Sequence, residues 1–209
     1  MFHVPCSMKF ILGKKVGMTQ MFDSDGKVVP VTLVSAGPCY VLQVKNKEND
    51  GYEAVQIGFE KIEKKNKIGK TMKGKEYKYL KEYRDRGGTG EGQSLNTGDG
   101  INVSIFQEAD NVKVSGMSKG KGFQGGVKRH GFSGRNATHG VKHEHRTLGS
   151  TGGRFPQHVM KGKKMPGRMG YERVSVKNLK VMKVEPENNL LIIKGAVPGR
   201  IGGLLEIRA

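Results

Sequence analysis

The chain has 209 residues and carries 37 Lys and Arg against 19 Asp and Glu, which gives a formal net charge of +18. Hydrophobic residues make up 35% of it, below the roughly 45–50% of an average globular chain, and 32 residues are glycine. No apolar run is long enough for a membrane span, the first residues lack the apolar stretch of a signal peptide, and two cysteines are too few for a disulfide framework. We therefore expect a cytoplasmic protein with a polyanionic partner, because self-repulsion at this charge density destabilises the free chain.

Short β-strands are predicted along both ends of the sequence. Each candidate is rich in Val and Ile and partly alternates apolar with polar residues: 27–34, 40–45, 54–59, 101–106, 174–184, 189–194 and 204–208. Turn signals such as Asp25-Gly26 and Gly37-Pro38 separate them. Many short strands with such turns indicate a mainly β fold, and we predict an antiparallel β-barrel as the globular domain.

Three polar segments between these strands are less well defined by their sequence. Residues 60–81 are rich in lysine and are typical of a solvated helix or a basic loop. Within and beyond them, 75–84 (KEYKYLKEYR) fits either an amphipathic helix or an edge strand, because its periodicity does not decide. Residues 86–100 are predicted as a polar loop.

The positive charge is concentrated in a basic window, residues 116–170. The window holds 12 basic residues, 14 glycines and Glu144 as its one acid, a net charge of +11, whereas 1–115 carry +4 and 171–209 carry +3. With one leucine and no isoleucine, it cannot bury enough apolar surface to offset its ordering entropy. We therefore predict a discontinuous barrel, 8–115 with 171–209. The window interrupts it as a Gly/Lys/Arg-rich extension with little regular structure beyond a short helix over 124–130.

No pattern in the sequence supports an enzyme. The glycine-rich stretches have the wrong spacing for a phosphate-binding loop. His139, His143 and His145 include an i, i+4 pair that can bind a metal on a helix, but flanking cations oppose a divalent ion and no cysteine accompanies them. Cys6 and Cys39 are interpreted as a tail residue and a core residue. We predict no catalytic residue, no metal site and no cofactor.

The pattern inside the basic window suits RNA. Basic residues alternate with glycines in 118–134 and 161–170, and Phe123, Phe132 and Phe155 lie between them. Lys and Arg neutralise phosphates, glycines let the backbone approach the sugar–phosphate chain, and aromatic rings stack on unpaired bases. DNA-binding motifs are absent from the sequence. An ordered RNA-binding extension is favoured. The alternatives are a sequence-nonspecific basic RNA chaperone and a metal-dependent RNA-processing enzyme.

Several stretches resemble, in the expected order, the bacterial large-subunit ribosomal protein three family: 13–22 (GKKVGMTQMF), 50–59 (DGYEAVQIGF), 118–130 (SKGKGFQGGVKRH), 161–170 (KGKKMPGRMG) with 174–179 (VSVKNL), and 189–199 (NLLIIKGAVPG). The resemblance covers about residues 8–209. It implies a β-barrel with a long extension that threads through 23S ribosomal RNA toward the peptidyl transferase centre. It also implies direct binding near the 3′ end of that RNA, nucleation of large-subunit assembly, and large-subunit proteins fourteen and nineteen as neighbours.

The resemblance further implies a structural constituent of the cytoplasmic ribosome, not an enzyme and not a homo-oligomer, with Mg²⁺ present only as part of the surrounding rRNA. The predicted phosphate contacts lie in the basic window and on the barrel side: Lys119, Lys121, Lys128, Arg129, Arg135, Lys142, Arg146, Lys161, Lys163, Lys164 and Arg168, with Lys14 and Lys15. Stacking or base contacts are predicted for Phe123, His130, His143, His145 and Phe155. Arg154, Phe155 and Pro156 are expected to form the tip nearest the catalytic RNA.

Three features depart from the family pattern. Residues 1–7 precede the usual start and are expected to be an extra, disordered tail, with Met8 as a candidate initiator. Lys113 stands where the family usually has an acid. Some members carry a methylated glutamine at the tip, but Gln157 lies off that position, so we do not predict the modification.

Overall fold

The computed structural model describes residues 5–6, 9–23, 25–64, 68–84 and 93–209. These residues form two compact units, which are described separately below. The first consists of the described residues up to Met117 together with Arg173–Ala209, and the second is Ser118–Glu172, which we call the extension. The predicted window, 116–170, differs from the extension by two residues at each end.

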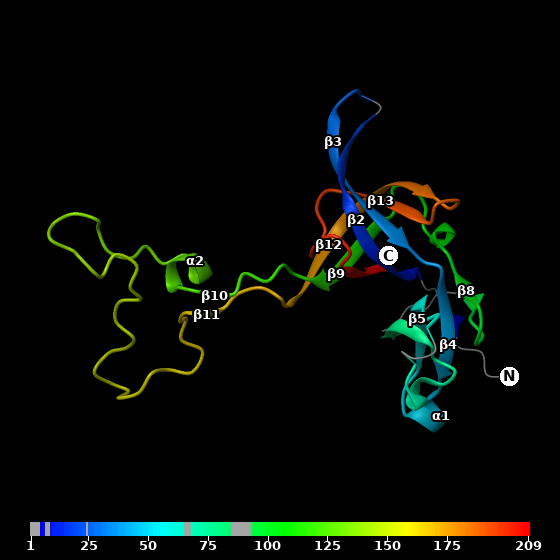
Figure 1. Cartoon of the computed structure of the whole chain (residues 1–209), viewed down its shortest axis with the longest axis horizontal. Coiled ribbons are helices and arrows are strands. Elements are labelled where there is room, and N and C mark those ends of the chain that lie inside the picture. Colours follow the sequence, from blue (N-terminus) through cyan, green and yellow to red (C-terminus); the bar gives the residue numbers. More distant parts are fainter. Residues whose placement is uncertain (1–4, 7–8, 24, 65–67, 85–92) are drawn as a thin grey trace. The chain divides into compact units, whose positions relative to one another are not determined.

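Six antiparallel strands of the first unit close into a barrel in the order β12-β13-β3-β2-β14-β9 (Figure 1). Their bounds are β2 Phe10–Phe22, β3 Val28–Ala36, β9 Asn111–Met117, β12 Arg173–Glu185, β13 Leu190–Lys194 and β14 Leu204–Arg208. The mainly β fold with an antiparallel barrel is confirmed. The predicted strands 27–34, 174–184, 189–194 and 204–208 correspond to β3, β12, β13 and β14.

A second sheet packs in the same unit, in the strand order β6-β5-β4-β8. Its strands are β4 Cys39–Lys45, β5 Ala54–Lys61, β6 Tyr77–Tyr83 and β8 Gly100–Ile101, and the shorter elements of the unit are α1 Lys47–Asp50, η2 Lys70–Met72 and η3 Val103–Ile105. β1 Pro5–Cys6 pairs with β7 Gln93–Ser94. Within the predicted N-terminal tail, Pro5–Cys6 therefore form a strand, and residues 1–4 and 7 lie outside the described residues.

The structure shows which secondary structure forms in the segments that the sequence patterns did not assign clearly. The prediction of a strand over 101–106 is wrong, because the strand ends at Ile101 and Val103 is buried in a 3-10 helix. The segment 75–84 contains an edge strand, β6, rather than a helix. Between β5 and β6, the described part of 60–81 has loop structure apart from η2. Of the predicted loop 86–100, residues 86–92 lie outside the described residues.

One hydrophobic core joins the barrel to the second sheet. Phe10, Ile11 and Leu12 are consecutive in β2 and all are fully buried. Because successive side chains of a strand point to opposite faces, this stretch needs cover on both sides. The second sheet and the barrel together supply this cover. The ring of Phe10 stacks on Tyr83 of the second sheet at 4.9 Å, and Ile11 and Leu12 belong to the same core cluster as the barrel residue Val114.

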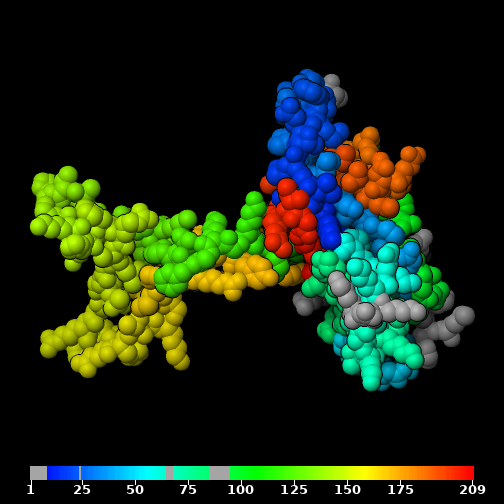
Figure 2. Space-filling view, in the orientation of Figure 1, coloured from blue at the N-terminus to red at the C-terminus, as the bar shows by residue number. Residues whose placement is uncertain are grey.

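The extension contains little regular structure, as predicted. Its elements are β10 Phe123–Gln124, α2 Gly126–His130 and β11 Gly167–Arg168, and β10 pairs with β11. The short helix predicted over 124–130 is confirmed as α2. Gly126 is the one buried residue of 118–172, a range that the structure describes throughout. Figure 2 shows this unit as narrow, branching segments.

Candidate nucleic-acid interface

The extension starts and ends as a two-stranded stem. The amide of Lys121 donates to the carbonyl of Met169, and the amide of Met169 donates to the carbonyl of Gly122, both at 2.9 Å. Gly170 has φ +71, and a Cβ at this position would overlap the carbonyl oxygen of Lys119. Glycine at position 170 therefore lets the two backbones of the stem approach closely, with the side chains of Lys119 and Lys121 exposed.

Two predicted RNA contacts, Arg129 and His130, anchor α2 to the returning chain. Arg129 Nη1 donates to the carbonyl oxygen of Met165 at 2.7 Å, and His130 Nε2 lies 3.0 Å from the same oxygen. A Cβ on Gly167 would lie 2.5 Å from Arg129 Nη1, so the guanidinium packs against bare backbone. Arginine has five N–H donors, so Arg129 can hold this turn and still donate to a phosphate.

The loop after α2 folds back on itself. The amide of Arg135 donates to the carbonyl of His145 at 3.1 Å, and Arg135 Nη1 pairs with Glu144 Oε2 at 2.6 Å. His145 Nδ1 lies 3.3 Å from the carbonyl oxygen of Asn136, whereas His143 is exposed. Arg135 is therefore partly neutralised within the loop, and His145 is partly engaged.

Most of the positive charge of the extension has no carboxylate partner. Over the fully described range 118–172, Arg135–Glu144 is the one ion pair. Ten further basic residues, all predicted RNA contacts, are exposed and lie beyond 4 Å of every described carboxylate: Lys119, Lys121, Lys128, Lys142, Arg146, Arg154, Lys161, Lys163, Lys164 and Arg168. Since like charges without counter-charges repel one another, this surface is suited to a polyanion.

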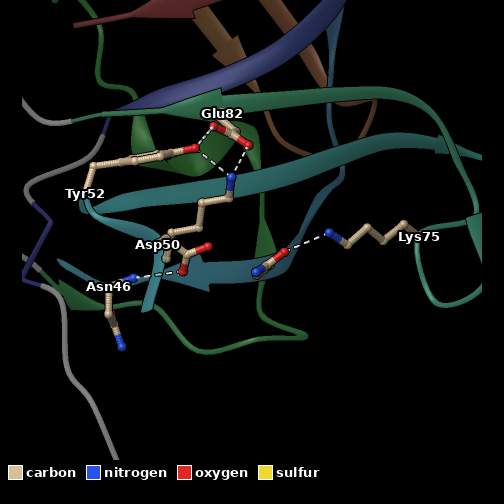
Figure 3. A network of polar contacts seen from close by, with 7 residues as sticks. Asn46, Asp50, Tyr52, Lys75 and Glu82 are labelled. Carbon is tan, nitrogen blue, oxygen red and sulfur yellow. Dashed lines mark hydrogen bonds and ion pairs between the residues drawn. The ribbon is translucent and has the colours of Figure 1, made fainter. Parts of the chain in front are cut away.

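Acids and bases of the first unit, by contrast, often neutralise each other. Lys45 Nζ donates to Tyr52 Oη and pairs with Glu82 Oε1, both at 2.7 Å, and Tyr52 Oη donates to Glu82 Oε2 at 3.0 Å. Figure 3 labels Tyr52 and Glu82 of this network. The hydrogen bond from Lys45 holds the pKa of Glu82 below its usual range. Such closed networks leave little charge for a ligand.

The two lysines predicted to hold RNA from the barrel side are engaged in the barrel. Lys14 pairs with Glu60, and its amine lies 5.7 Å from the centroid of the Tyr79 ring. Lys15 is only 8% exposed, and its Nζ donates to the carbonyl of Val197 at 3.0 Å. Their contact with RNA stays a prediction, and the candidate interface consists of residues of the extension alone.

Exposed aromatic rings lie between the cations of the extension. Phe123 is 76% exposed and Phe155 is 74% exposed, with Arg154 Cζ 5.9 Å from the Phe155 centroid. Tyr171, which was not predicted as a site residue, is 60% exposed and lies beneath Arg168, whose Cζ is 5.0 Å from the ring centroid. Its position directly after the basic motif that ends at Gly170 is the sequence feature that could have identified it as a site residue. Such rings offer flat surfaces for base stacking.

Within the described residues, no group of three or more His, Cys, Asp or Glu side chains is arranged to hold a metal ion. The described chain also has no helix with the length and apolar character of a membrane span.

Curated relatives align with nearly the whole chain. The protein of Carboxydothermus hydrogenoformans is 49% identical over 207 residues, with 96% of each chain covered. Those of Corynebacterium jeikeium and Thermosipho africanus are 49% and 48% identical and also cover 96% of this chain, with 94% and 98% of their own lengths aligned. The chain belongs to the ribosomal protein L3 family. All three relatives carry the name large ribosomal subunit protein uL3.

The family model, described as ribosomal protein L3, matches residues 96–192, a range that contains the whole extension. Membership of the L3 family makes the chain a structural constituent of the large ribosomal subunit, in the cytoplasm and in the ribosome, and not an enzyme. As a ribosomal protein it associates with rRNA and with other ribosomal proteins.

Proposed function

We propose that the extension is the principal rRNA-binding element of this L3-family chain. It binds 23S rRNA directly near the 3′ end, nucleates assembly of the large subunit, and reaches toward the peptidyl transferase centre with Arg154, Phe155 and Pro156 at its tip. The observation that carries the proposal is the set of ten exposed cations without carboxylate partners on a unit with a single buried residue.

The physical reason is that such a unit gains its ordering energy from a ligand. With only Gly126 buried, the loops of the extension lack a core that offsets their conformational entropy. Phosphates would neutralise the repelling cations and release counterions from the RNA, which favours binding. The stem and α2 already fix part of the backbone, so less entropy is lost when the remaining loops become ordered on RNA.

The family to which the chain belongs supports finer assignments within the proposal. The neighbours in the particle are large-subunit proteins fourteen and nineteen, and the chain does not form a homo-oligomer. It carries no cofactor of its own, and Mg²⁺ belongs to the rRNA around it.

Salt dependence of binding to a transcript of the 23S 3′ domain tests the proposal. Neutralising about six phosphates predicts a fall in affinity of about a thousandfold between about 50 and about 200 mM salt. Replacing Lys161, Lys163 and Lys164 together by Ala should lower the log–log slope by about two to three, since each phosphate contact contributes about 0.7–0.9. The matched control replaces Lys177, Lys180 and Lys194, exposed lysines of β12 and β13, and should leave the slope almost unchanged.

Equal slopes in the two triple variants would contradict the assignment of the interface to the extension. Equal affinity for the 3′-domain transcript and for a scrambled RNA of the same length would favour the nonspecific chaperone instead. A chain that stays in the soluble fraction, away from the large ribosomal particle in a gradient at moderate salt, would contradict the proposal as a whole.

A further inference from the structure

The outer face of the second sheet carries an exposed tyrosine whose partners on the neighbouring strands are both glycines. Tyr40 in β4 is paired with Gly58 of β5 on one side and with Gly100 of β8 on the other. Its neighbours along the chain, Cys39 and Val41, are buried in the core, so Tyr40 points to the opposite face. Neither cross-strand partner has a side chain that could cover the ring of Tyr40, which is 39% exposed.

A second ring, that of Tyr77, lies next to the ring of Tyr40. Tyr77 of β6 lies over Gly58, where a Cβ would be 2.6 Å from Tyr77 Cγ, so a larger residue at position 58 would displace the ring. The ring centroids of Tyr40 and Tyr77 are 5.9 Å apart, with an interplanar angle of 37°. Burial and the nearby phenol of Tyr40 raise the pKa of Tyr77.

Hollows flank the two rings. One, of ≈ 390 Å³, is lined by Tyr40, Tyr77, Lys61, Gly74 and Gly98, among others. Another, of ≈ 550 Å³, is lined by the same two tyrosines and Lys61 on the side of Pro38. We name Tyr40, Tyr77 and Lys61 the tyrosine groove. Its hollows give flat ligands access to the rings from more than one side.

The charge around the tyrosine groove favours an anionic ligand. Lys61 lines both hollows, and Lys73 directly precedes Gly74 of the first one. Both lysines are exposed, and neither has a carboxylate partner among the described residues. Of the acids nearby, Glu60 is occupied by Lys14 and Lys78. Glu76 also lines the groove, and its carboxylate can accept a hydrogen bond from the exocyclic amino group of a base.

We propose that the tyrosine groove binds an unpaired nucleobase of RNA, which stacks on Tyr40 and Tyr77 while Lys61 contacts an adjoining phosphate. Aromatic rings and nearby cations together are the features by which proteins hold single-stranded RNA. This contact is separate from the extension, and it rests on the proposed function in that RNA is the ligand. Lysine is depleted in protein–protein interfaces, so Lys61 beside the two rings favours RNA over a protein partner.

Site-resolved photo-crosslinking with the full chain tests the inference. The probe is a single-stranded RNA of about ten nucleotides that contains 5-iodouridine, and the adducts are located by peptide mass spectrometry. We expect adducts on Tyr40 or Tyr77 as well as in the extension. Tyr40→Leu should lower the yield of the adduct on Tyr77 about tenfold, whereas Tyr40→Phe, which keeps the ring, should preserve it.

Two controls make the result specific. Phe22→Leu removes an exposed aromatic ring from the barrel strand β2 and should leave the groove adducts unchanged. Thermal melting of each variant shows that the sheet is intact, and a Tyr77→Phe variant repeats the measurement with adducts read on Tyr40.

Adducts confined to the extension would overturn the tyrosine groove while the proposed function stands, and would point to a protein partner for this face. Absence of adducts from the whole chain would also overturn the tyrosine groove, whereas the proposed function is decided separately by the salt dependence of binding to the 3′-domain transcript. Groove adducts that persist in Tyr40→Leu would refute stacking on this pair of rings.

Discussion

Replacement of Gly170 by Ala should open the stem of the extension without unfolding the barrel. Gly170 has φ +71, a conformation that costs alanine about 1–2 kcal/mol, and its new methyl group would overlap the carbonyl oxygen of Lys119. Relieving that overlap displaces the stem hydrogen bonds between Lys121, Met169 and Gly122, worth about 0.5–1.5 kcal/mol each. With two such hydrogen bonds, we expect a loss of about 2–5 kcal/mol in the local stability of the stem.

The matched control is Gly122→Ala in the same stem. Gly122 also has a positive φ, +67, but a Cβ there meets nothing within 4 Å. This variant therefore pays the backbone cost of about 1–2 kcal/mol without the overlap. The difference between the two variants isolates the close approach to the carbonyl of Lys119.

Native-state hydrogen exchange at the amides of Lys121 and Met169 measures the effect. These amides should exchange about five- to a hundredfold faster in Gly170→Ala than in Gly122→Ala, since the two hydrogen bonds are worth about 1–3 kcal/mol together and about 1.4 kcal/mol corresponds to tenfold. Core amides such as that of Val114 should exchange as in the unchanged chain, because the barrel forms a separate unit. Equal exchange in the two variants would refute the close packing of the stem on which the prediction depends.

Three further outcomes follow from the first unit. Glu206→Gln should lower the free energy of unfolding by about 1–3 kcal/mol in urea titrations, because Arg173 loses its partner at a mostly buried carboxylate; an unchanged midpoint would contradict this. The hydrogen bond from Lys9 lowers the pKa of Asp110, so its stabilisation exists above the ordinary Asp pKa and is lost as the pH falls through the folded value. Asp110→Asn should therefore flatten the loss of stability below about pH 4, and an equally steep loss would argue against the pair. Burial raises the pKa of Cys39 to about 12, so iodoacetamide at about pH 8 should modify Cys39 only in urea. Peptide mass spectrometry separates Cys39 from Cys6, and rapid labelling of Cys39 in the native chain would contradict its burial.

The extension was predictable because composition determines its physics directly. A segment with 12 basic residues and hardly any large aliphatic side chains cannot build a core wherever it is placed. Its candidate cations could therefore be named from the sequence, and ten of them are exposed and without carboxylate partners. The sequence did not show that Arg129 and His130 also bind the carbonyl of Met165, because that contact spans 36 and 35 residues of chain.

The barrel strands were predictable only where one face meets solvent or where a continuous β-branched run marks a buried strand. β12 and β3 show such patterns and were predicted. The whole of β2 escaped prediction, and its start shows why, because Phe10, Ile11 and Leu12 are all buried and show no alternation. β9 was also missed, and Val103 was placed in a strand although it fills the core from a 3-10 turn.

By itself, then, the sequence determined the partition of charge, the mainly β fold and the family, since these depend on composition, short-range pattern and motifs. Tertiary structure decided which side chains are brought together and which are used internally. Lys15 lies in β2, and only the fold brings its amine to the carbonyl of Val197, where it donates a buried hydrogen bond. Tyr40 became an open platform only because strand register sets it between Gly58 and Gly100, residues 18 and 60 positions away. Register between distant strands is fixed by packing of the whole core, which no local pattern encodes.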